Sequence, residues 1–236
     1  MTPDAIYAVL EQTWPAASYA RVGPWLIRAG AGGGQRVSAA TPAAAYEESD
    51  IPQAEAAMAA LDQAPLFMLR HSDGRLDDML AARGYQRHDP VVVYAAPVAE
   101  LASPEPSPMA AFPTWPPLSI AVQLWEEAGI GPGRLAVMNR VTGPKTCILG
   151  RANDRASGVA FVACYDGCAM VHALEVSPTQ RRQGSAQNIM RMAAVWAGAQ
   201  GADTLCLAVT EANIPARALY AALGMTVVGA YHYRKK

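Results

Sequence analysis

The stretch VSPTQRRQGSAQNIM, residues Val176–Met190, is the most informative part of the sequence. Pro178 ends a strand, and a helix opens close to Gly184. The amide groups at a helix start have no partner within the helix and carry partial positive charge, so they bind anions. Small residues let a diphosphate approach the main chain, and arginines supply countercharge. The stretch predicts either a diphosphate site or an ordinary solvated helix start. The site would comprise Arg181, Arg182, Gln183, Gly184, Ser185 and Ala186.

The segments around this stretch form an α+β pattern. Asp166-Gly167 is typical of a two-residue type I′ hairpin turn, because both positions need a positive φ. Gly224 is placed to end a helix. Strands are predicted at 145–151, 157–165, 168–176, 204–209 and 227–234, and helices at 118–129, 134–140, the segment before residue 200, and 216–223. We expect a mixed, mostly antiparallel sheet flanked by helices.

A second motif begins 32 residues after Arg181. It reads Asn213-x-x-Ala216-x-x-Leu219-Tyr220-x-x-x-Gly224-Met225. Together with Arg181-x-x-Gly184-x-Ala186, it resembles the two signature motifs of the GNAT superfamily of acetyl-CoA-dependent N-acetyltransferases. Met225 stands where that family usually has Phe. The resemblance covers residues 112–236 well and residues 1–98 only weakly.

The resemblance implies how acetyl-CoA is bound. Its diphosphate lies on the segment 181–186, and its pantetheine arm lies in a gap between the strands 168–176 and 204–209. The arm pairs with the main chain near Leu174 and Val176. The helix that carries Asn213 and Ala216 flanks it.

The resemblance also implies catalytic roles. Tyr220 protonates the departing CoA thiolate, unless it is only a packed helix residue. The proton acceptor is Glu175, His172, or a water or main-chain route. Strand alternation places His172 and Glu175 on opposite faces unless a bulge intervenes, so we do not expect them to act together.

Seven of the 18 prolines lie between Pro97 and Pro117, which indicates an extended linker. We therefore predict one domain at 1–98, a linker at 99–111 and a catalytic domain at 112–236. When the sequence is shifted by 140 residues, the C-terminal parts of the two halves align without a gap. PLFML, at 65–69, then aligns with LCLAV, at 205–209. The alternative is a chance likeness in an Ala-rich chain.

The aligned positions suggest that the N-terminal half is a degenerate GNAT-like domain, so we expect each half to form its own mixed, mostly antiparallel sheet flanked by helices. Thr41 stands at the position of Arg181, Ala44 at that of Gly184, and Leu80 at that of Tyr220. Neither the phosphate site nor the acid is retained in this half. We expect the half to form a wall of the acceptor site or to pack against the active half.

Other signals limit the class of protein. With 19 basic and 20 acidic residues the net charge is -1, which gives no field for nucleic acid or an anionic membrane. No signal-peptide pattern is present and the four cysteines follow no secreted spacing, which favours the cytoplasm. No metal is predicted, because Cys164 and Cys168 have no second ligand pair. The glycines of GAGGG, at 30–34, predict a hairpin turn.

These observations favour an enzyme that moves acetyl from acetyl-CoA to a primary amine by direct attack. The acceptor is either a small metabolite or a peptide or protein amine. The alternatives are a non-catalytic acyl-CoA sensor and a plain interaction module. The sequence leaves open whether the protein is a monomer or a homodimer.

Overall fold

A computed structural model describes the backbone of residues 3–236 and the side chains of residues 5–236. The helices are α1 (Pro3–Thr13), α2 (Ile51–Ala59), α3 (Gly74–Ala82), α4 (Val98–Leu101), α5 (Ser119–Glu127), α6 (Pro132–Arg140), α7 (Ser185–Ala199) and α8 (Ile214–Ala222). The strands are β1 (Ser18–Val22), β2 (Trp25–Ala29), β3 (Thr41–Pro42), β4 (Leu66–Arg70), β5 (Gln86–Pro97), β6 (Ala111–Thr114), β7 (Lys145–Ala152), β8 (Arg155–Tyr165), β9 (Cys168–Val176), β10 (Thr204–Thr210) and β11 (Thr226–Lys235). Single 3₁₀ turns are η1 (Gln35–Val37), η2 (Glu48–Asp50) and η3 (Pro178–Gln180).

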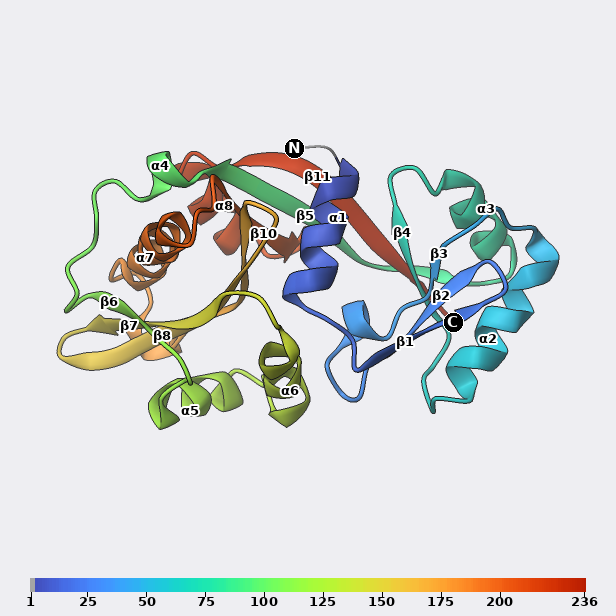
Figure 1. Cartoon of the computed structure of the whole chain (residues 1–236), viewed down its shortest axis with the longest axis horizontal. Helices are drawn as coiled ribbons and strands as arrows, with labels where there is room; N and C mark the ends of the chain where they lie inside the picture. Colours follow the sequence, from blue (N-terminus) through green and yellow to red (C-terminus); the bar gives the residue numbers. More distant parts are fainter. Residues whose placement is uncertain (1–2) are drawn as a thin grey trace.

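One eight-stranded sheet runs through the molecule in the order β4-β11-β5-β10-β9-β8-β7-β6 (Figure 1). A separate three-stranded sheet has the order β1-β2-β3. In the large sheet only β9 and β10 pair in parallel, and the other neighbours are antiparallel. The expected α+β class, with a mixed and mostly antiparallel sheet, is therefore confirmed.

Local sequence signals placed the elements of the C-terminal half well. The predicted hairpin joins β8 to β9, with Asp166 at φ 48 and Gly167 at φ 71, as a type I′ turn requires. Gly224, at φ 80, follows the end of α8. Both glycines supply a left-handed conformation that a residue with a Cβ adopts only with strain.

The long strands β5 and β11 cross between the halves of the chain. β5 lies between β11 and β10, while β11 lies between β4 and β5. The sequence predicted a sheet of its own for each half, and this needs correction, because strands of both halves form one ladder. Local patterning specifies which residues are extended, whereas pairing partners are chosen by long-range packing.

The offset of 140 residues is visible in the structure. α3 spans 74–82 and α8 spans 214–222, so the offset superimposes their bounds, and β5 and β11 begin at 86 and 226. α3 and α8 lie near opposite ends of the paired strands β5 and β11 (Figure 1). The same offset thus relates α3 to α8 and the start of β5 to that of β11, while in the sheet β11 lies beside β4 and β5 lies beside β10.

Helices cover both faces of the sheet. On one face, α7 packs Ile189 and Met190 against Ile148 of β7 and Ala160 of β8. On the other face, Trp125 of α5 packs with Phe161, whose side chain points away from α7. A further cluster in the N-terminal half joins α2 and α3 to β2 and β4. No helix between residues 3 and 236 has the length and apolar character needed to cross a bilayer.

The proline-rich segment is more ordered than an extended linker. Its first residues form α4, which packs against α7, and its end forms β6, which pairs with β7. Pro113 is tolerated because β6 is an edge strand, where a missing N–H breaks no ladder hydrogen bond. At the other end of the chain, Arg234 belongs to β11, and its Nε donates to Asp77 Oδ1 at 2.6 Å.

Candidate functional site

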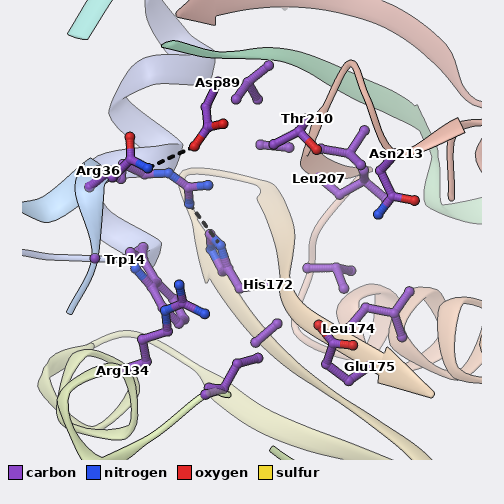
Figure 2. Close-up of a pocket in the computed structure, with 18 of the residues that line it drawn as sticks. Trp14, Arg36, Asp89, Arg134, His172, Leu174, Glu175, Leu207, Thr210 and Asn213 are labelled. Atoms are coloured by element: carbon purple, nitrogen blue, oxygen red, sulfur yellow. Dashed lines mark hydrogen bonds between the residues drawn. The ribbon is translucent and has the colours of Figure 1, made fainter. Parts of the chain in front are cut away.

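The site is built where two parallel strands separate. β9 and β10 pair from Cys168–Thr204 to Val171–Leu207, and their pairing stops there although both strands continue. A cavity of ≈ 380 Å³ opens beside the separated ends (Figure 2). The gap predicted between these strands is therefore present.

A β-bulge in β9 decides which side chains enter the cavity. Phe161 pairs with His172 but Val159 pairs with Glu175, so Ala173 and Leu174 together oppose one residue of β8. Ala173 has φ 50, and Trp125 Nε1 donates to its carbonyl oxygen at 2.8 Å. Simple alternation would separate His172 from Glu175, but this extra residue lets His172, Leu174 and Glu175 all line one cavity.

Tyr220 reaches the cavity from α8. Asn213 caps this helix by accepting a hydrogen bond at Oδ1 from the amide of Ala216 at 3.2 Å, and it also lines the cavity. The Tyr220 ring lies 5.7 Å from that of Tyr94, centroid to centroid. Burial, and in second place the charge of Glu175, raises the pKa of Tyr220 to about 12. The phenol therefore holds its proton and can donate it.

Glu175 is the carboxyl group that faces Tyr220. Burial raises the pKa of Glu175, while the charges of Arg181 and Arg134 act in the opposite direction. A raised pKa makes this carboxylate a better proton acceptor than a solvated one.

Hydrogen bonds occupy both ring nitrogens of His172. Arg36 Nη1 donates to Nδ1 at 3.2 Å, and because a guanidinium can only donate, Nδ1 is unprotonated. Nε2 therefore carries the proton and donates to Thr13 Oγ1 at 2.9 Å, while that hydroxyl donates to the carbonyl of Val9 at 2.6 Å. Burial, assisted by the charge of Arg36, lowers the pKa of His172 well below its ordinary value. This geometry favours a neutral positioning residue over a proton acceptor.

The predicted phosphate segment lies beyond the end of β9. Gly184 has φ 78 and directly precedes α7, and a Cβ added there would meet no atom within 4 Å. Ser185 Oγ is buried without a hydrogen-bond partner among the described residues. Asn153 Nδ2 donates to Gln183 Oε1 at 2.7 Å, and Arg181 Nε donates to Val176 O at 3.3 Å. The helix start is thus open to an anion.

The predicted residues fall into two groups. His172, Leu174, Glu175, Asn213 and Tyr220 line the cavity. Val176, Arg181, Arg182, Gln183, Gly184, Ser185 and Ala186 lie outside the cavity lining, along the exit of β9 and the start of α7, and Ala216 lies on α8.

The sequence led us to expect that the N-terminal half walls the acceptor site or packs against the active half, but it did not identify which residues line the cavity. The glycines at 30–34 do form a turn, with Gly32 at φ 78 and Gly34 at φ 99, but η1 follows where the hairpin prediction placed a strand. This turn brings Arg36 to the cavity. Local sequence gave no signal that Arg36 lies beside this cavity, because the residues that meet there come from segments far apart in the chain. The lining residues found only in the structure include Trp14, Gln35, Arg36, Asp89, Arg134, Tyr231 and Tyr233.

The cysteines do not build a metal site. Cys168 and Cys206, on β9 and β10, are buried with their sulfurs 3.3 Å apart. Within the described part of the chain, no group of three or more His, Cys, Asp or Glu side chains is arranged to hold a metal ion.

The chain belongs to the acetyltransferase (GNAT) family, whose sequence profile matches residues 106–225. It is thus a GNAT-family N-acetyltransferase with the α+β fold of that family. It is 24% identical over 233 residues to "Uncharacterized N-acetyltransferase YobR" of Bacillus subtilis (strain 168), covering 95% of this chain and 94% of that protein.

Solved structures agree with this fold over nearly the whole chain. A GCN5-related N-acetyltransferase from Kribbella flavida superimposes with a TM-score of 0.73 at 17% identity, covering 99% of this chain and 95% of that one. A functionally unknown conserved protein from Staphylococcus epidermidis ATCC 12228 gives a TM-score of 0.70 at 12% identity, covering 100% and 97%. At these identities the likeness concerns the fold alone.

Proposed function

We propose that this protein transfers the acetyl group of acetyl-CoA to a primary amine by direct attack. The observation that carries the proposal is the opening between β9 and β10, whose walls hold Tyr220 and Glu175. An unobstructed helix start lies just beyond the same end of β9, at Gly184. The family identity makes acetyl-CoA the donor to test first.

The residues present fit that donor. At Gly184 nothing blocks approach to the main chain, and the buried Ser185 Oγ lacks a partner among the described residues. The amides that begin α7 and the arginines at 181 and 182 would hold the diphosphate. Beyond Val171 no described strand pairs with β9 on its β10 side, so the pantetheine arm would pair there with the main chain near Leu174 and Val176, where Arg181 Nε donates to Val176 O. Bound acetyl-CoA would supply an activated acetyl group as a thioester.

Two side chains of this chain would move the protons. Glu175 takes a proton from the incoming amine, directly or through water, because its raised pKa favours the protonated form more than in solution. Tyr220 donates its proton to the departing sulfur, since its pKa of about 12 keeps it protonated at neutral pH. His172 acts by positioning Arg36 and Thr13.

The N-terminal half supports this function as a degenerate copy that walls the site. Leu80, which corresponds to Tyr220 at the offset of 140, is completely buried in the core of its own half. Thr41 is likewise buried, and its Oγ1 accepts a hydrogen bond from Arg28. We therefore propose one acetyl-CoA site per chain, in the C-terminal half.

A matched pair of glycine variants tests the donor site. Gly184→Glu places a carboxylate where the diphosphate would lie, and Gly201→Glu introduces the same residue at the other end of α7. Both glycines have similar φ values, 78 and 81, and free space around a Cβ, so both substitutions strain the backbone alike. Acetyl-CoA should raise the melting temperature of the wild type and of Gly201→Glu, but not that of Gly184→Glu. Equal shifts in both variants would show that the phosphate site is misplaced.

Release of free CoA thiol separates an enzyme from a sensor. The proposed enzyme releases CoA when an amine acceptor is added, and a screen of small amines and peptides measures this directly. A protein that is stabilised by acetyl-CoA but releases no CoA with any acceptor would be the non-catalytic acyl-CoA sensor.

A further inference from the structure

The Arg36 guanidinium lies on the side of the cavity where the acceptor would bind. Hydrogen bonds to His172 and Tyr231 hold it in place without neutralising its charge. Arg36 Nη1 donates to His172 Nδ1, and Arg36 Nε donates to Tyr231 Oη, each at 3.2 Å. These partners come from β9 and β11, so the side chain is fixed from two strands. Trp14 lies against the His172 ring, with centroids 4.9 Å apart, and supports it from behind.

Neither arginine of this wall has a described carboxylate within ion-pair distance, although the charge of Arg134 acts on Glu175. Arg36 forms no ion pair with any residue from 5 to 236, and the Arg134 guanidinium makes neither an ion pair nor a hydrogen bond within that range. A partly buried charge is costly unless an opposite charge accompanies it. The remaining N–H groups of Arg36 are donors that suit a planar carboxylate.

The two acids of the cavity are not equivalent. Asp89 accepts a hydrogen bond from Gln35 Nε2 at 2.8 Å and lies 3.2 Å from His88 Nε2, so the protein itself already engages it. Glu175 has no such partner within 4.0 Å among the described residues, and it lines the same cavity as Tyr220, whose pKa its charge raises. Figure 2 shows Arg36 and Arg134 on one side of His172, and Leu174 and Glu175 on the other.

Arg36 and Arg134 are thus separated from Glu175 across the cavity. Such an arrangement suits a molecule whose two ends differ in chemistry. An amine must approach the Glu175 and Tyr220 side to react, which leaves its other end beside Arg36 and Arg134. The cavity of ≈ 380 Å³ is at the lower end of the range for small-molecule sites. We propose that the acceptor is a small amino acid: an amine that also carries a carboxylate, which Arg36 and Arg134 bind. This inference rests on the proposed acetyl transfer.

Pairs of acceptors that differ only in that charge test the inference. Glycine, β-alanine and 4-aminobutanoate are each compared with their carboxamide at equal concentrations of unprotonated amine, with CoA release as the readout. A peptide with an amidated C-terminus is added as a further acceptor. The amino acids should give kcat/KM values roughly 10- to 100-fold above those of their amides, the range for a charge-assisted hydrogen bond. Equal use of the amides, or better use of the peptide, would overturn the inference and leave acetyl transfer standing.

Arginine variants identify the groups responsible. Arg36→Gln and Arg134→Gln should each reduce the preference for the carboxylate, measured as the ratio of kcat/KM for an amino acid to kcat/KM for its amide. Of the two variants, Arg134→Gln should disturb folding less. Arg134 is exposed, and its side chain makes no hydrogen bond or ion pair with the described residues. Arg21→Gln, on the exposed strand β1, is the control and should keep the preference. A preference that survives in the double variant of Arg36 and Arg134 contradicts the assignment.

A binding measurement keeps the inference separate from the activity. The same amino acids and amides are titrated calorimetrically into protein saturated with CoA, which carries no acetyl group and permits no turnover. Tighter binding of the carboxylates, lost in Arg36→Gln, supports the inference even without a rate. Carboxylates that bind no better than amides overturn it, whereas failure to release CoA from any amine overturns the proposed transfer.

Discussion

Replacing Tyr220 by Phe tests the proposed acid with little disturbance to the fold. The ring is 6% exposed and packs beside Tyr94, and the substitution keeps that packing. The hydroxyl makes no hydrogen bond to any described residue, so its removal should change the free energy of unfolding by less than about 0.5 kcal/mol. Loss of a general acid lowers rates by about 10²–10⁴, or about 2.7–5.5 kcal/mol in activation free energy. We therefore expect a large fall in kcat with nearly unchanged stability.

Three measurements decide this prediction. CoA release gives kcat, calorimetry gives the affinity for acetyl-CoA, and thermal unfolding gives stability. Tyr94→Phe is the matched control, because its ring lies 5.7 Å from that of Tyr220 and its hydroxyl only accepts a long hydrogen bond from Arg217, at 3.5 Å. If Tyr220→Phe turns over like the wild type with its best acceptor, the tyrosine is a packing residue and water supplies the proton.

Other predictions concern pH and stoichiometry. Glu175 must be ionised to accept a proton and its pKa is raised, so kcat/KM should fall as the pH drops through that pKa, and Glu175→Gln should lack this acidic limb in a pH–rate profile. His172 has a folded pKa below its unfolded value of 6.5, so its contribution to stability is present above pH 6.5 and is lost below it, by at most about 1.4 kcal/mol per pH unit. Chemical denaturation of His172→Gln should show a weaker loss of stability on acidification than the wild type, and an unchanged slope would contradict the neutral buried histidine. Isothermal titration should give one acetyl-CoA per chain; two would contradict the loss of the phosphate site at Thr41 and Ala44.

The secondary structure could be read from the sequence because its signals are local. β9 was predicted with its observed bounds, since Asp166-Gly167 fixes the turn before it and Pro178 follows its end. The neighbours of β5 and β11 in the sheet, by contrast, could not be predicted from the sequence. The residues of β5 and β11 predict extended chain whichever strand lies beside them, and only packing of the complete sheet selects their neighbours. The short edge strand β6 was hidden by its proline.

Part of the candidate site could also be predicted from the sequence, because its signals are local. The segment at 181–186 and the helix with Tyr220 carry motifs within short stretches. The bulge at Ala173 had no such signal, because alanine is not a residue that favours φ 50, and the carbonyl there is held by the distant Trp125. Arg36 reaches the cavity only through contacts with His172 and Tyr231, far away in the sequence. Packing between distant segments of the chain, and not composition, places Arg36 in the cavity.

The position of β11 between β4 and β5 also bears on the order of events as the chain is synthesised. β4 and β5 are made early, yet the position between them belongs to β11, which follows β5 by more than half of the 236 residues. Domains commonly fold as they leave the ribosome. Here the N-terminal half cannot complete its sheet until β11 has emerged, and contacts of such long range form slowly. The two halves therefore reach the native state together, as one cooperative unit.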